Sequence, residues 1–185
     1  MKKLLVSLLA LLMLVGCGTK SNENEEVTEN SKDEIIEDSN SNVQIANPYV
    51  EYETAKEMMD AAKLSISLPE ENPEGTTNVI YRAIPDELIE VIYELGEDNE
   101  IRIRTKVGNE DISGIYDSDE KLEEKEIEIT ALSIKLKGHT NEDGEFIVLS
   151  ATWTTNYNRS YSITSTKGVP ELIITPLIGT LNNID

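Results

Sequence analysis

The chain has 185 residues, of which 36 are acidic and 16 are basic, so its formal net charge at pH 7 is −20. Nucleic-acid-binding proteins need a basic patch that neutralises phosphates, and anionic membrane surfaces attract basic segments. The charge balance therefore argues against nucleic acid as a partner and against a domain that lies flat on lipid. A single cysteine excludes an internal disulfide, so stability must come from a packed core.

The first residues have the layout of a secretory signal peptide. Two lysines precede an apolar run, residues 4–14, which is too short to span a bilayer because a membrane helix needs about 20 apolar residues. Leu14, Val15, Gly16 and Cys17 resemble the lipobox of bacterial lipoprotein signal peptides at all four positions. The resemblance implies cleavage after Gly16 (signal peptide 1–16) and a lipid on Cys17, which would anchor the protein at the extracytoplasmic face of the cell membrane. The alternative is an ordinary signal peptide followed by an unmodified cysteine.

An acidic linker is expected to follow, over residues 17–47. Beyond the cysteine it contains eight acids, two lysines and no aromatic residue, so it cannot bury enough apolar surface to offset its ordering entropy. We expect a disordered tether that carries one folded domain, residues 48–185.

The folded part begins with a predicted helix over residues 54–63. Thr54 can cap it, and Glu57 stands at the capping-box spacing. Ala55, Met58, Met59 and Ala62 lie on one helical face, which indicates a core face.

Period-two patterns predict strands from Thr76 onward. Residues 79–81 begin a strand that should end at Pro85, and residues 101–107 alternate apolar with basic side chains. Residues 87–94 also fit a helical stripe, but their β-branched content and the following turn favour a strand.

The sequence pattern of residues 124–181 predicts a hairpin, two further strands and a C-terminal helix. The hairpin pairs residues 124–130 with 133–138, so that glutamates and lysines meet on one face. Strands are expected over 146–157 and 161–166, and a helix over 171–181, which Pro176 should kink or end.

Short segments of the domain resemble the DUF4367 type of domain from exported lipoproteins of Gram-positive bacteria. They are Asn47-Pro48 with the capped helix, Ile92-Tyr93-Glu94, Asp111-Ile112-Ser113-Gly114 followed by Tyr116, Leu136-Lys137-Gly138, Ala151-Thr152-Trp153 and Tyr161-Ser162-Ile163. The resemblance implies an α+β fold, a curved antiparallel sheet flanked by an N-terminal helix and a short C-terminal helix, with no assigned chemistry. Two departures are the Thr130-Ala131 turn, which is often Asn-Gly in such domains, and Pro176.

Catalytic and metal-binding motifs are not recognisable in the sequence. His139, expected in a loop, has no nucleophile motif to serve, and zinc sites need several His or Cys ligands, so neither a cofactor nor a zinc ion is expected. Asp111, Asp117, Asp119 and Glu120 offer oxygen atoms to calcium but lack the EF-hand spacing, so calcium binding stays open.

Two functions remain compatible with the sequence. The first is a non-enzymatic binding or sensing module that meets an envelope protein or a cell-wall component, and the second is a cell-envelope hydrolase that uses two carboxylates. The basic strip of residues 102–106 could meet the partner or be neutralised by neighbouring acids. The segment from Asp111 to Gly114 is most simply a tight turn. Trp153 is expected to be a core anchor rather than a sugar contact. The candidate contact residues are Arg102, Arg104, Lys106, Asp111, Ser113, Tyr116 and Trp153.

Overall fold

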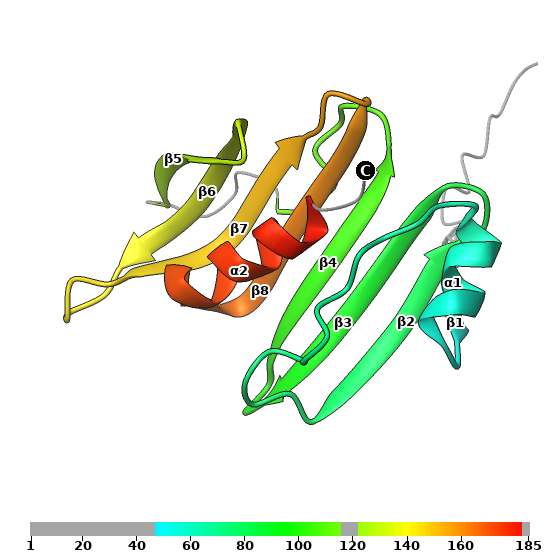
Figure 1. The fold of residues 1–185 in the computed structure, drawn as a ribbon. Helices are drawn as coiled ribbons and strands as arrows, with labels where there is room; N and C mark the ends of the chain where they lie inside the picture. The colour runs from blue at the N-terminus through cyan, green and yellow to red at the C-terminus, as the bar shows by residue number, and fades with distance from the viewer. Residues whose placement is uncertain (1–46, 116–121, 183–185) are drawn as a thin grey trace, which may run out of the picture. The chain divides into compact units, whose positions relative to one another are not determined.

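A computed structural model describes residues 47–115 and 122–182 as an open antiparallel sheet with two helices (Figure 1). The signal peptide, Cys17, nearly all of the linker and Tyr116, Asp117, Asp119 and Glu120 lie outside these residues. Within the described ranges, neither helix has the length and apolar character needed to cross a membrane. The predicted α+β fold class is confirmed.

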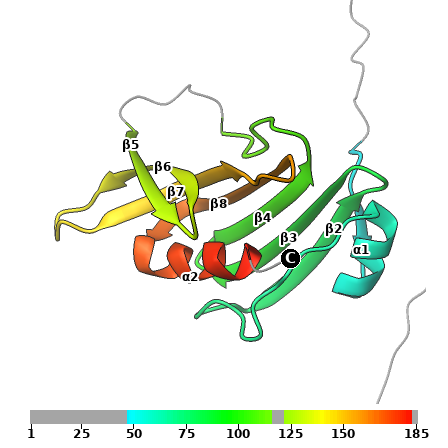
Figure 2. The same ribbon diagram turned by 45° about the horizontal axis from the view of Figure 1, so that its top comes forward.

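The elements are β1 (Val50–Tyr52), α1 (Ala55–Ala62), β2 (Asn78–Ile84), β3 (Leu88–Gly96), β4 (Asn99–Val107), β5 (Glu123–Ile129), β6 (Leu132–Thr140), β7 (Phe146–Thr154), β8 (Arg159–Pro170) and α2 (Glu171–Leu181). The eight strands lie in the order β1-β2-β3-β4-β8-β7-β6-β5. Consecutive strands pair within β1–β4 and within β5–β8, and the β4–β8 pair joins the two halves. Helix α1 packs on β1, β2 and β3, whereas α2 packs on β7 and β8 (Figure 2).

Helix α1 begins where the sequence predicts. The Thr54 hydroxyl accepts a hydrogen bond from the Glu57 amide, and the Glu57 carboxylate accepts one from the Thr54 amide, both at 3.2 Å. The helix ends at Lys63, which adopts a left-handed conformation with φ 55°. Met58 and Ala62 are buried against the sheet, so the predicted apolar face is confirmed.

The segment predicted over residues 87–94 is a strand, as its β-branched content favours, and the structure gives it the bounds Leu88–Gly96. Every residue from Leu88 to Tyr93 is buried, so both faces of β3 are covered. Burial on both faces explains the helix-like apolar pattern, because a doubly buried strand loses the polar alternation. Strand β2 ends at Ile84, immediately before Pro85, as predicted.

The β5–β6 hairpin places glutamates and lysines on one face, as predicted, and its register sets Glu126 opposite Lys135. Thr130 and Ala131 form its two-residue turn, with φ values of 49° and 62°. The placement of His139 in a loop is wrong, because it is an exposed residue of β6. The strand continues through a bulge at Gly138, where an added Cβ would lie 2.0 Å from the Ile147 carbonyl oxygen.

Strand β7 ends at Thr154, three residues before the predicted end. The Thr155 amide donates to the Arg159 carbonyl at 2.9 Å, and Asn158 adopts φ 56°, so the chain turns earlier than its composition suggests. Strand β8 then runs on to Pro170, beyond the predicted Thr166.

Helix α2 is continuous through Pro176, so the expectation that the proline could end it is wrong. Proline removes one backbone hydrogen bond. Burial on both sides of that position offsets the loss, since Ile174 before it and Leu177, Ile178 and Leu181 after it are buried against the sheet.

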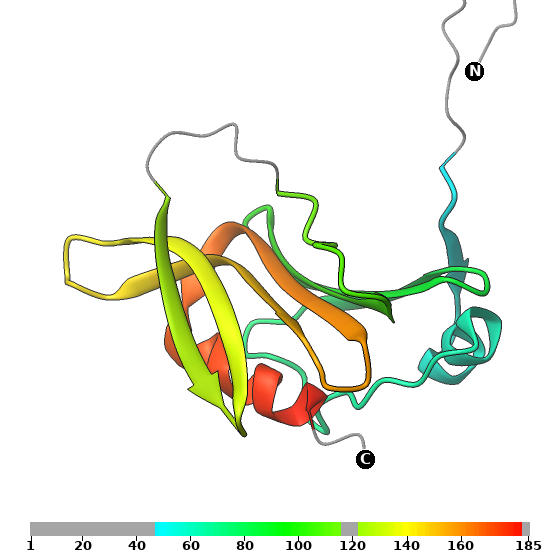
Figure 3. The same cartoon turned by 90° about the horizontal axis from the view of Figure 1, so that it is seen from above.

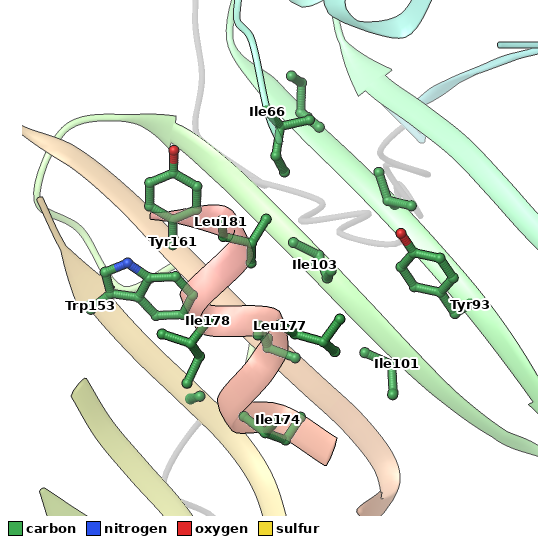
Figure 4. Packing of buried hydrophobic residues seen from close by; sticks show 14 of the residues in the cluster. Ile66, Tyr93, Ile101, Ile103, Trp153, Tyr161, Ile174, Leu177, Ile178 and Leu181 are labelled. Carbon is green, nitrogen blue, oxygen red and sulfur yellow. The ribbon is translucent and has the colours of Figure 1, made fainter. Parts of the chain in front are cut away.

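The core lies between the helices and one face of the sheet (Figure 4). Trp153 stacks on Tyr161 with ring centroids 5.2 Å apart and planes 6° apart. The Trp153 indole N–H also donates to the Asn182 side-chain oxygen at 2.8 Å, immediately after α2. With 5% of its surface exposed, Trp153 is the predicted core anchor and offers no stacking platform for a sugar.

Candidate functional site

The sheet face opposite the helices is polar, and we call it the polar face. One cross-strand row on it runs through Arg82, Glu90, Arg104, Ser162, Thr152, Lys135 and Glu126. Side chains alternate between faces along a strand, so this row cannot contribute to the helix-covered core. Figure 3 shows both helices on one side of the sheet and the segment after β4 on the other.

Glu90 of β3 lies on the polar face and is fully buried. Arg82 donates two hydrogen bonds to its Oε1, the one from Nε being 2.8 Å long, and Arg104 Nε donates to Oε2 at 2.7 Å. Arg102 Nε lies 3.6 Å from the same Oε2. We call these four residues the Glu90–arginine cluster. A buried carboxylate needs such partners, because its desolvation is otherwise very costly.

Acidic residues also neutralise the outer part of the predicted basic strip. Arg102 Nη2 lies 2.5 Å from a Glu100 oxygen, and Lys106 Nζ lies 3.0 Å from Glu110 and 3.5 Å from Glu87. The hydrogen bond to Glu110 raises the pKa of Lys106, and the charges of Glu110 and Glu87 add to this effect. Neighbouring acids therefore neutralise the strip, which is one of the two roles expected for it, and the expected contact with a partner stays a prediction.

Tyr49 borders the Glu90–arginine cluster where the folded part begins. The Arg82 guanidinium lies 5.2 Å from the centre of its ring, which is cation–π distance. Partial burial raises the pKa of Tyr49, and the nearby Glu90 carboxylate raises it further. Tyr49 therefore covers part of the cluster as a neutral phenol.

Arg104 also holds the segment that leaves β4. Its Nη1 donates to the carbonyl oxygens of Ile112 and Ser113, both at 3.0 Å. The hydroxyl of Ser160 donates to the Gly108 carbonyl at 2.9 Å, and that of Ser162 to the Ile112 carbonyl at 3.3 Å. Residues 108–113 are thereby fixed over β8 on the polar face.

Asp111 to Gly114 form the tight turn that the sequence predicts. The Asp111 carboxylate accepts from the Ser113 amide at 2.8 Å, and the Ser113 hydroxyl accepts from the Ile115 amide at 3.2 Å. Gly114 has φ 73°, and an added Cβ would lie 2.9 Å from Arg104 Nη1. The positive φ favours glycine at this position, and a side chain there would also displace the end of the Arg104 side chain.

A pocket of about 330 Å³ opens beside this turn, above β7, and we call it the β7 pocket. Residues 109–111 form one wall, and Ser133 and Lys135 of β6 form the other. Its lining residues are Asn109, Glu110, Asp111, Ser133, Lys135, Thr152, Trp153, Thr154 and Tyr161. The lining therefore contains two acidic side chains, Glu110 and Asp111, and one basic side chain, Lys135.

The structure brings five of the seven predicted contact residues to the polar face. Arg102, Arg104, Lys106, Asp111 and Ser113 lie there, Trp153 belongs to the core, and Tyr116 lies outside the described residues. No group of three or more His, Cys, Asp or Glu side chains suited to a metal occurs in residues 47–115 and 122–182.

Sequence reasoning missed Glu90, Arg82 and Lys135. The sequence contains a cue that Glu90 is a buried, paired acid, since it is the one acid inside the apolar run 88–93 and has arginines on both neighbouring strands. Lys135 was expected only as a partner of the hairpin glutamates. Lys135 lines a pocket because residues 108–113, which follow β4, lie over β8. No local sequence pattern predicts this placement.

The chain matches no protein-family model, no curated protein and no solved structure. The resemblance to the DUF4367 type of domain therefore stays a prediction.

Proposed function

We propose that the protein is a lipoprotein anchored through Cys17 at the extracytoplasmic face of the bacterial membrane, and that its domain is a non-enzymatic binding module. The observation that carries the proposal is the polar face, which the helices leave uncovered and which holds the β7 pocket. An envelope protein or cell-wall component is the partner class that suits this location.

Carboxylate-dependent hydrolysis is the alternative, and it needs two carboxyl groups about 5–9 Å apart with room for substrate or water. The oxygens of Glu90 accept hydrogen bonds from arginines and the side chain is fully buried, so a substrate does not reach this acid. In the β7 pocket, Glu110 pairs with Lys106, and Asp111 accepts the Ser113 amide. These contacts support binding over hydrolysis.

Cell fractionation tests the anchor. Cys17→Ser should move the protein from the membrane fraction to the soluble fraction, because the acyl chains supply the membrane affinity. A variant that stays with the membrane would contradict the proposed anchor.

Site-specific photocrosslinking in whole cells tests the binding surface. A photoreactive residue at Thr154, which is exposed at the β7 pocket, should give a defined crosslinked product. The matched control is Leu172, which is 83% exposed on α2, on the other side of the sheet. Equal products from both positions, or none from Thr154, would count against the polar face as the binding surface.

A further inference from the structure

We propose that the β7 pocket binds a small zwitterion, a molecule that carries an ammonium group and a carboxylate, such as an amino acid or a dipeptide. This inference rests on the proposed function, since it names the ligand class of the same polar face.

Lys135 supplies the positive group. Its side chain is exposed on β6 and lines the pocket. Within residues 47–115 and 122–182, it forms no ion pair or hydrogen bond. Glu126 stands opposite Lys135 in the register but is hydrogen-bonded to the Ser133 hydroxyl instead. Lys135 therefore keeps three N–H donors for an anionic group of a ligand.

Asp111 supplies the negative group on the facing wall. Its Oδ1 accepts a hydrogen bond from the Ser113 amide, which fixes the carboxylate at the start of the turn. A carboxylate has about four acceptor positions, so the remaining ones can receive an ammonium group. The neighbouring Glu110 is partly neutralised by Lys106, which makes Asp111 the main acceptor of the pair.

Charge selects a zwitterion over simpler ligands. A simple anion is repelled by a chain with net charge −20, and a simple cation uses only the Asp111 wall. A neutral sugar uses neither charge, and the pocket offers it no exposed aromatic ring, because Trp153 and Tyr161 are 5% and 3% exposed. A zwitterion is neutral overall, so it escapes the repulsion and pairs with both walls.

The floor and size of the pocket fit the same class. The hydroxyls of Thr152 and Thr154 rise from β7 between the two walls, because both side chains belong to the polar face. They can bond the polar backbone of a small peptide. A volume of about 330 Å³ lies at the lower end of the range for small-molecule sites, which suits a compact ligand.

Isothermal titration of the full chain in detergent tests the inference, with alanyl-alanine as the probe. Acetate, methylamine and glucose represent the anion, the cation and the neutral polyol. We expect alanyl-alanine to bind with a Kd below about 10 mM and the other three compounds at least about tenfold more weakly.

Two substitutions remove one charge each and leave the fold in place. Asp111→Asn keeps the oxygen that accepts the Ser113 amide, and Lys135→Gln changes an exposed side chain. Each should weaken binding by at least about tenfold. Lys56→Gln, on the exposed face of α1, is the control and should leave binding unchanged.

Three results would overturn the inference: no binding of alanyl-alanine at about 10 mM, equal binding of glucose, or binding that neither Asp111→Asn nor Lys135→Gln weakens. A crosslinked partner at Thr154 together with any of these results would leave the proposed function intact and refute the zwitterion alone. Failure of the crosslinking with successful titration would refute a macromolecular partner and keep the pocket.

Discussion

Glu90→Gln should be among the most damaging conservative changes in the domain. The substitution keeps the shape of the side chain but leaves three guanidinium groups facing a neutral amide. Removing one partner of a buried ion pair costs about 3–5 kcal/mol. Arg82, Arg102 and Arg104 are 19%, 27% and 14% exposed, so they partly regain water when the carboxylate is lost. We therefore expect a loss of about 3 kcal/mol in the free energy of unfolding, at the lower end of that range.

Urea unfolding followed by Trp153 fluorescence measures this loss, because the indole is buried against Tyr161 and α2. Glu100→Gln is the control, since Glu100 is 29% exposed and, within residues 47–115 and 122–182, forms an ion pair with Arg102 only. This pair is partly buried, with 27% and 29% of the two side chains exposed, so we expect its loss to cost about 1 kcal/mol, less than the loss of the fully buried Glu90 carboxylate. A Glu90→Gln variant no less stable than Glu100→Gln would refute the view that the Glu90–arginine cluster stabilises the sheet.

Three further changes test other parts of the fold. Gly138→Ala should lower the free energy of unfolding by at least about 2 kcal/mol, because the new Cβ clashes with the Ile147 carbonyl oxygen. An unchanged urea unfolding curve would contradict the close packing at this bulge. Thr130→Asn with Ala131→Gly should raise the melting temperature by a few degrees, since both positions have positive φ; a lower value in calorimetry would refute this turn. Burial raises the pKa of the Tyr93 hydroxyl above its usual 10. The folded state then holds its proton more tightly than the unfolded state, so stability is kept below pH 10 and falls above it. Tyr93→Phe should flatten that fall in urea unfolding at alkaline pH, and an identical pH profile would show that Tyr93 is not its cause.

Local patterns predicted most elements of this fold because their causes are local. The capping box of Thr54 and Glu57 fixes the start of α1, and the alternation of residues 101–107 fixes the two faces of β4. Where distant residues decide, the prediction was wrong. His139 lies in a strand because Gly138 packs against β7, and α2 passes Pro176 because the sheet buries residues on both sides of it.

The candidate site was predictable only in part for the same reason. The sequence picks out Arg102, Arg104 and Asp111 by their charge and turn chemistry. It does not show that Glu90 neutralises the arginines, nor that the turn after β4 faces Lys135 across β7. The first fact follows from the register of β2, β3 and β4, and the second from the strand order, which places β8 and β7 between β4 and β6.

That strand order also bears on how the domain folds. Within each half of the sheet, pairing joins neighbours in sequence, so each half can form with small loop-closure entropy. The β4–β8 pair instead brings together residues as distant as Ile101 and Ser165. Non-local pairing of this kind slows folding. We infer that the docking of β8 on β4 limits the folding rate. Helix α2 directly follows β8 in the chain and packs on β7 and β8, so it belongs to the half of the sheet that has to dock.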